Sequence, residues 1–73
     1  MQEGILMFDQ QADRVDIRFD NGDYYGGLHC GTPVEVWLNG QWFASRIELS
    51  SQSWFLVGVK PDIIWGLRVR IVD

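Results

Sequence analysis

The sequence has few of the residues on which metal sites and enzymes depend. Among its 73 residues are one cysteine, Cys30, and one histidine, His29. No internal disulfide can form, and structural zinc usually needs four Cys or His ligands. A catalytic cysteine needs a base close in space, whereas in an extended segment the adjacent histidine points the other way. We therefore expect no catalytic residue, no metal and no cofactor, with His29 in a loop and Cys30 half-buried.

Long apolar runs are also missing. No segment is apolar over the length that a bilayer span requires, and the N-terminus has no signal-peptide pattern. With a single cysteine, the chain suits a reducing compartment. We expect a cytoplasmic protein that does not bind membranes.

Positive charge is scarce. Six Lys and Arg stand against ten Asp and Glu, which gives a formal net charge of -4. Proteins that bind duplex nucleic acid usually neutralise phosphates with a surplus of Lys and Arg, so this class is disfavoured. The acids gather in residues 1–36, whose net charge is about -5, whereas residues 37–73 carry about +1.

Helical periodicity is almost absent, and what replaces it is alternation of apolar and polar residues in short segments between turns. The pattern predicts one all-β domain over residues 1–73, with five to six antiparallel strands. Strands this short cannot hide all their edges in a flat sheet, so we expect a small barrel. Aromatic residues make up 14% of the chain, and we expect them to supply much of the core. The predicted strands are 4–8, 14–19, 34–38, 41–49, 54–59 and 67–72.

Two segments alternate cleanly. In RVDIRF, Val15, Ile17 and Phe19 face one side and Arg14, Asp16 and Arg18 the other. In LRVRIV, Leu67, Val69 and Ile71 share a face opposite Arg68 and Arg70. We predict that each apolar set faces the core and that the charged sets, Asp16 included, face water.

The segment VEVWLNGQWF predicts a hairpin, because Asn39-Gly40 is a strong two-residue turn signal. Trp37 then opposes Trp42 in a closely spaced, non-hydrogen-bonded pair. Val34, Val36, Leu38 and Phe43 lie on the other, more aliphatic face, which we predict to be the core. The two indoles project outward, where they clamp the hairpin, lie beneath the segment of residues 20–33 or form a binding surface.

Residues 20–33 contain four of the eight glycines, one of the two prolines and no alternation. We interpret them as a long exposed connection, and such loops often bind ligands. Tyr24 and Tyr25 lie in this loop and would extend the indole surface if they fold beside it. Trp54 and Trp65 lie at strand ends, where we expect them to plug the barrel.

The order of a glycine-bearing loop, GTPVEVWLNGQWFASRIEL, a polar turn and a further strand resembles SH3-like barrels, including Tudor-type modules, over residues 26–72. The resemblance implies a fold and transfers no ligand. The whole chain, through FDQQADRVDIRFDNGDYYGGLHCGTPVEV, LNGQW and GLRVRI, looks like an uncharacterised family of short proteins from Gram-positive bacteria, often encoded in mobile elements.

These patterns favour a non-enzymatic protein-interaction module that binds through Trp37 and Trp42, with Tyr24 and Tyr25 next in line. One alternative is a mobile-element inhibitor of a host defence nuclease, an anti-CRISPR-like role that the acidic N-terminal half would suit. Another is a single-stranded nucleic-acid-binding module that uses Arg46, Arg68 and Arg70 with stacked aromatics. Whether the chain forms homo-oligomers stays open.

Overall fold

The computed structural model describes residues 2–60 and 63–71, and in this part of the chain every regular element is a β-strand. The prediction of an all-β domain is thus confirmed. No helix in the described part is long and apolar enough to cross a membrane. Val72 and the Pro61-Asp62 interruption lie outside the described residues. The strands are β1 (Gln2–Asp9), β2 (Arg14–Phe19), β3 (Pro33–Leu38), β4 (Gln41–Ser50), β5 (Ser53–Leu56) and β6 (Arg68–Ile71).

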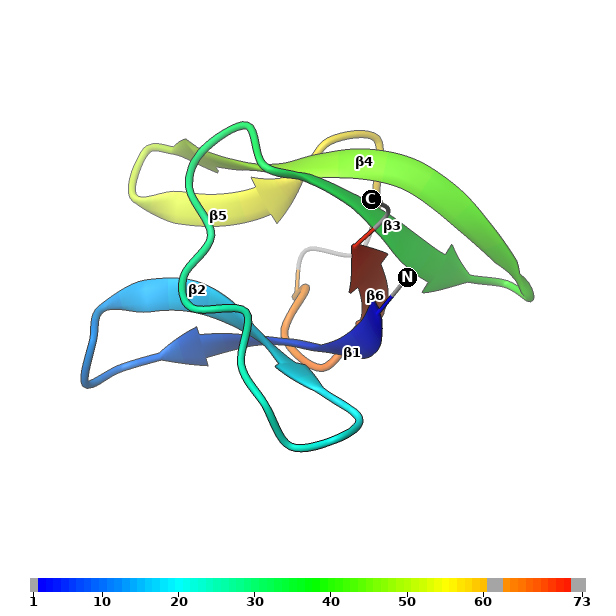
Figure 1. The fold of residues 1–73 in the computed structure, drawn as a ribbon. Helices are drawn as coiled ribbons and strands as arrows, with labels where there is room; N and C mark the ends of the chain where they lie inside the picture. Colours follow the sequence, from blue (N-terminus) through cyan, green and yellow to red (C-terminus); the bar gives the residue numbers. More distant parts are fainter. Residues whose placement is uncertain (1, 61–62, 72–73) are drawn as a thin grey trace.

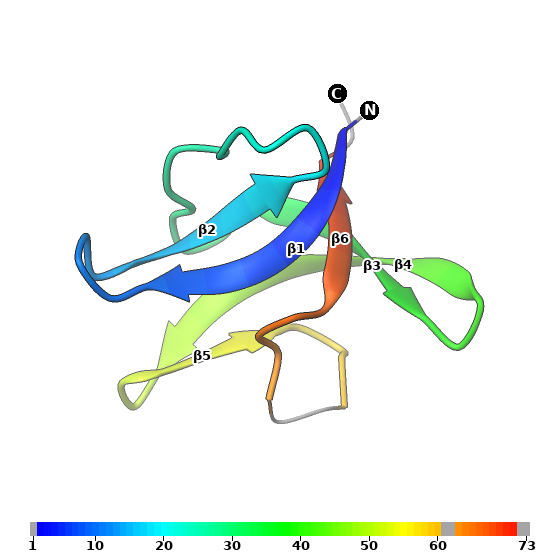
Figure 2. The same ribbon diagram turned by 90° about the horizontal axis from the view of Figure 1, so that it is seen from below.

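The strands form one antiparallel sheet in the order β2-β1-β6-β3-β4-β5. Three tight hairpins join neighbours in the chain, and β6 returns to pair with both β1 and β3. Figures 1 and 2 show the consequence: β1 and β2 form one layer, β3, β4 and β5 form another, and β6 connects the two. The sheet therefore curls into a small, barrel-like body.

The core lies between the two layers and is mostly aliphatic. Phe19, which is 6% exposed, is the one aromatic residue among the buried core residues, and all four tryptophans are at least partly exposed. The expectation that aromatic residues supply much of the core was wrong, because short aliphatic side chains fill the narrow space inside so strongly curved a sheet. The buried apolar residues are Leu6, Val15, Ile17, Phe19, Leu28, Val34, Val36, Ile47, Leu56, Ile64 and Val69.

Phe43 was predicted to face the core but is 41% exposed. Its position in the alternation is the core-facing one, since it pairs with Val36. However, β6 covers β3 only at Glu35 and Val36, and the β3–β4 hairpin continues past this point into solvent (Figure 1). Phe43 therefore lies beyond the end of the core.

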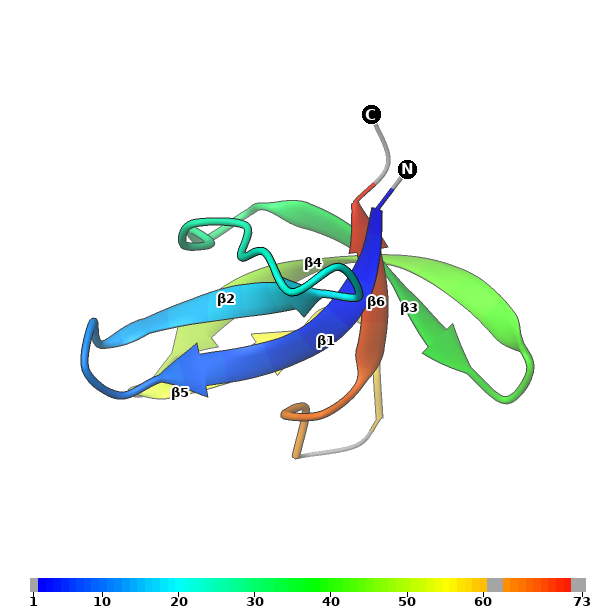
Figure 3. The same cartoon turned by 60° about the horizontal axis from the view of Figure 1, so that its bottom comes forward.

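Residues 20–33 form the long, mostly exposed connection that their composition predicts, and backbone hydrogen bonds hold it against the sheet. The amide of Tyr25 donates to the carbonyl of Ile17, and the amide of Leu28 donates to that of Val15, so the loop follows the free edge of β2. The amide of Gly31 then donates to the carbonyl of Ile47 in β4. The loop thus covers one sheet edge and links the two layers, as Figure 3 shows from below.

Asp16 fastens this loop, and its predicted exposure was wrong. Its residue is 1% exposed, and its Oδ1 accepts hydrogen bonds from the amides of Ile17 (2.8 Å), Gly26 (3.0 Å) and Gly27 (3.2 Å). Both glycines have positive φ, of 104° and 107°, which turns their amides toward the carboxylate. The Arg14 guanidinium lies 3.7 Å away and supplies a counter-charge.

We predict that Asp16→Ala lowers the free energy of unfolding by about 2–3 kcal/mol, because three backbone amides lose a charged acceptor. Asp16→Asn keeps an Oδ1 acceptor and is expected to lose less. Urea denaturation followed by tryptophan fluorescence measures both changes. Asp23→Ala, at an exposed position in the same loop, is the control, and a loss from Asp16→Ala no larger than this control's would contradict the role of Asp16.

Candidate functional site

The Asn39-Gly40 turn places Trp37 and Trp42 directly opposite each other. Both turn residues have positive φ, 52° and 81°, as the mirror-image turns of two-residue hairpins require. The register pairs Leu38 with Gln41, Trp37 with Trp42 and Val36 with Phe43, which confirms the predicted pairing. Because alternate residues face opposite sides of a strand, both indoles lie on the outer face.

The two indoles contact each other edge to face. Their ring centroids are 5.1 Å apart and the ring planes meet at 62°. This geometry places the positive edge of one ring against the negative face of the other. Trp37 is 41% exposed, whereas Trp42 is half-buried, so Trp37 presents more of its ring to solvent.

Arg70 covers the outer side of Trp42. Its guanidinium carbon lies 4.2 Å from the centroid of the Trp42 ring, a cation–π distance. Its Nε donates to Oε1 of Glu35 at 2.6 Å, and Glu35 is the cross-strand partner of Arg70 in the sheet. The guanidinium is therefore held by a carboxylate on β3 while it lies over the ring. We call Glu35, Trp37, Trp42 and Arg70 the indole surface.

Arg46 and Arg68, the other two arginines considered for nucleic-acid binding, are also paired with acids. Nε of Arg46 donates to Glu48 at 2.8 Å, and Nη1 of Arg68 lies 3.1 Å from Asp20 and 3.5 Å from Glu3. Hydrogen bonding to Asp20, aided by the charges of Asp20 and Glu3, raises the pKa of Arg68. All three arginines are therefore engaged in ion pairs, which leaves less positive charge for phosphate groups.

Tyr24 and Tyr25 are exposed, at 55% and 43%, but they do not lie beside the indole surface. Tyr24 forms a bridge to Arg18 of β2, and the Tyr25 ring packs against Phe19 of β2 at 6.5 Å. In the sheet, β1 and β6 lie between β2 and β3. The four aromatic residues predicted to bind thus form two separate pairs.

His29 and Cys30 both lie exposed in the loop. The predicted loop position of the histidine is confirmed, whereas the predicted half-burial of the cysteine was wrong. The His29 backbone closes a small turn, with its amide donating to Oγ1 of Thr32 at 3.1 Å and its carbonyl accepting from the same hydroxyl at 2.7 Å.

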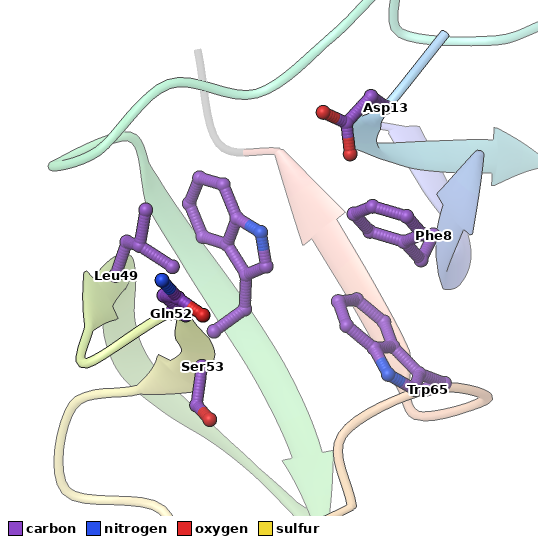
Figure 4. Close-up of a pocket in the computed structure, with 7 residues that line it drawn as sticks. Phe8, Asp13, Leu49, Gln52, Ser53 and Trp65 are labelled. Carbon is purple, nitrogen blue, oxygen red and sulfur yellow. The ribbon is translucent and has the colours of Figure 1, made fainter. Parts of the chain in front are cut away.

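Trp54 and Trp65 do not plug the barrel. Trp54 packs against the core and is half-buried, and Trp65 is 39% exposed. Both line an open cleft of about 800 Å³ between the β1–β2 turn and the β4–β5 turn (Figure 4). We call this the aromatic cleft, and its lining residues are Phe8, Asp13, Leu49, Gln52, Ser53, Trp54 and Trp65.

Sequence reasoning missed the aromatic cleft because its walls come from opposite ends of the chain. Phe8 and Trp65 are 57 positions apart, yet their rings lie 5.7 Å from each other at an angle of 55°. The one local signal was the position of Trp54 and Trp65 at strand ends. A strand-end position fits a plug inside a closed barrel as well as it fits the wall of an open cleft. Only the arrangement of the β1–β2 and β4–β5 hairpins distinguishes the plug from the cleft.

The fold and both aromatic surfaces define a small barrel-like β domain. The chain belongs to the family described as a domain of unknown function, DUF5348, whose model matches residues 4–71. The predicted membership of an uncharacterised family is thus confirmed.

The chain is also similar to a crystal structure of a protein from Ruminococcus gnavus, determined by the Northeast Structural Genomics Consortium. The two sequences are 45% identical, the match covers 94% of this chain and 99% of the other, and the TM-score is 0.86. The curated proteins contain no significant match to the sequence. The comparisons therefore support the fold and the family and leave the activity to be inferred from the surfaces.

We predict that Trp37 and Trp42 stabilise the hairpin cooperatively. A double-mutant cycle of Trp37→Thr and Trp42→Thr, measured by urea denaturation, should give a coupling free energy of about 0.5–1.5 kcal/mol. The control cycle combines Trp37→Thr with Phe55→Thr on β5, since β4 separates these positions. Equal coupling in both cycles would mean that the ring contact adds nothing of its own.

Proposed function

We propose that the protein is a non-enzymatic protein-interaction module of the bacterial cytoplasm and that it binds a partner through the indole surface. One observation carries the proposal: two tryptophans face outward on a β-hairpin, in contact with each other and fixed by an arginine. The core contains no tryptophan, so the requirements of the core do not explain these two. Tryptophan and arginine are also the side chains most enriched at binding hot spots.

The order of the indole surface supports binding. Immobilising a flexible side chain on association costs about 0.5–1.5 kcal/mol. Here Trp37 is held by Trp42, Trp42 by Arg70, and Arg70 by Glu35. Much of this ordering has already taken place in the free protein, so a partner that packs on Trp37 would lose less entropy.

The non-enzymatic part of the proposal rests on the chemistry available. His29 and Cys30 are adjacent in the chain and exposed on a loop, not gathered in a cleft with a substrate-sized volume. The aromatic cleft is lined by one ionisable side chain, Asp13. An SH3-like barrel over residues 26–72 stays a prediction, and such folds often serve as binding modules.

Of the two alternatives, single-stranded nucleic acid binding is the less favoured, because Arg46, Arg68 and Arg70 each pair with an acid. Inhibition of a defence nuclease would need a free acidic face. On the N-terminal half, Arg68 pairs with Glu3 and Asp20, which lowers the negative charge available there. Both remain less supported than binding through the indoles.

The test compares the wild-type chain with Trp37→Thr/Trp42→Thr in affinity capture from lysate of the native host, with retained proteins identified by mass spectrometry. We expect a partner that the wild type retains and the double variant loses. The matched control is Phe55→Thr, which removes another aromatic of 41% exposure from the outer face of the same layer.

Circular dichroism and a cooperative unfolding transition must first establish that both the double variant and Phe55→Thr are folded. A partner retained equally by the wild type and the double variant, or lost equally from the double variant and from Phe55→Thr, would refute the assignment of the interface to the indole surface.

A further inference from the structure

The aromatic cleft has the composition of a cation site. Three rings, those of Phe8, Trp54 and Trp65, line it together with the aliphatic side chain of Leu49. Phe8 and Trp65 stand on one side of the opening, and Leu49, Gln52 and Ser53 stand on the other (Figure 4). Its volume of about 800 Å³ lies within the range of ligand pockets, about 300–1,000 Å³.

Asp13 supplies the only charge in this lining. It lies in the β1–β2 turn with φ of 53°, a conformation that Asp and Asn tolerate better than most residues. Figure 4 places its carboxylate beside Phe8 at the edge of the cleft. The negative charge would repel an anion and attract a cation.

The Asp13 carboxylate also differs from the other acids of residues 2–60 and 63–71. Each of those acids accepts a hydrogen bond. Asp9 and Asp16 accept from backbone amides, and Asp23 accepts from the side chain of Asn21. The acids that accept from an arginine are Glu3, Asp20, Glu35 and Glu48. Within this described part, no hydrogen bond or ion pair engages Asp13. Its charge is thus available to a ligand.

From this combination we infer that the aromatic cleft binds the ammonium group of a lysine side chain on a partner polypeptide. A cation within about 6 Å of an aromatic face is attracted by the ring quadrupole, with a gain of about 0.5–1 kcal/mol at exposed sites. Several rings and one carboxylate act together here. The methylene stem of a lysine would pack on Leu49 and the rings while its charged end reaches Asp13.

A polypeptide is favoured over a free small cation because of the strand beside the cleft. Within the described residues β5 pairs with β4 alone, and it contributes Ser53 and Trp54 to the lining. On its second edge the carbonyl of Leu56 already accepts from the amide of Val59, whereas the backbone groups of Trp54 point outward. An extended chain can therefore add main-chain hydrogen bonds there to the contact of its side chain. The aromatic cleft and the indole surface are different surfaces, so an experiment can refute binding at one of them without refuting binding at the other.

The test uses the indole N–H signals of the ¹⁵N-labelled chain, which report the four tryptophans separately. The probe is the peptide acetyl-Gly-Lys-Gly-amide, titrated at low ionic strength and millimolar concentration. We expect the signals of Trp54 and Trp65 to shift with a common dissociation constant, and those of Trp37 and Trp42 to stay in place. The same peptide with norleucine in place of lysine keeps the apolar stem without the charge, and it should shift them far less.

Two substitutions locate the charge. Asp13→Asn suits the same backbone conformation and is expected to raise the dissociation constant about two- to fivefold, the range of an exposed ion pair. Asp23→Asn removes an equal charge from another exposed turn and should leave the dissociation constant unchanged. Choline chloride, a small ammonium without a peptide backbone, should shift the Trp54 and Trp65 signals more weakly than the lysyl peptide.

Equal shifts with the norleucine peptide would overturn the inference in favour of a purely apolar groove. Choline binding as tight as the lysyl peptide would replace the polypeptide by a small ammonium ligand. No shift of the Trp54 and Trp65 signals, or shifts confined to Trp37 and Trp42, would remove the site.

Discussion

The pairing of β6 with both β1 and β3 is the contact on which the rest of the structure depends. Without it, the β1–β2 hairpin and the β3–β4–β5 meander would be separate, and an isolated two-stranded hairpin is at best marginally stable in water. Val69 of β6 is fully buried between the two layers. The chain enters β6 through Gly66 and Leu67. The amide of Gly66 donates to the carbonyl of Leu6 in β1, and the carbonyl of Leu67 accepts from the amide of Leu6.

The same strand organises the outer face. Residues that alternate with Val69 must point outward, and these are Arg68 and Arg70. Arg68 reaches Asp20 and Glu3 on the β1 side, and Arg70 reaches Glu35 and Trp42 on the β3 side. One four-residue strand thus completes the core on one side and pairs charges across both junctions on the other.

The sequence was informative wherever the deciding contacts are local. Asn39-Gly40 determines the hairpin turn, and with it the register that brings Trp37 and Trp42 together. Alternation also placed Val69 and its neighbours correctly. The predicted exposure of Asp16 was wrong, because alternation indicates which face of the strand a residue occupies but does not indicate which other segment covers that face. Asp16 is buried by the loop of residues 20–33. The hydrogen bonds that hold this loop come from the amides of Gly26 and Gly27, ten and eleven positions along the chain from Asp16.

The placement of the tryptophans follows from the size of the core. A strongly curved sheet of short strands leaves a narrow interior, which Leu, Ile and Val fill at native density. The indoles lie outside this space, Trp37 and Trp42 on the outer face of the β3–β4 hairpin and Trp54 and Trp65 at the aromatic cleft. Trp42 lies near the start of β4 and Leu49 of the aromatic cleft near its end, seven residues away, or roughly 20 Å along an extended strand.

This separation limits what a single partner can do. A side chain that packs on Trp37 cannot also enter the aromatic cleft, so simultaneous contact with both surfaces needs an extended partner or two partners. The cation–π contact and the ion pair of Arg70 order the indole surface from within the protein, whereas Asp13 has no such internal partner in the described residues. The first surface is therefore complete as a packing platform, and the second lacks a positive charge that a ligand would supply.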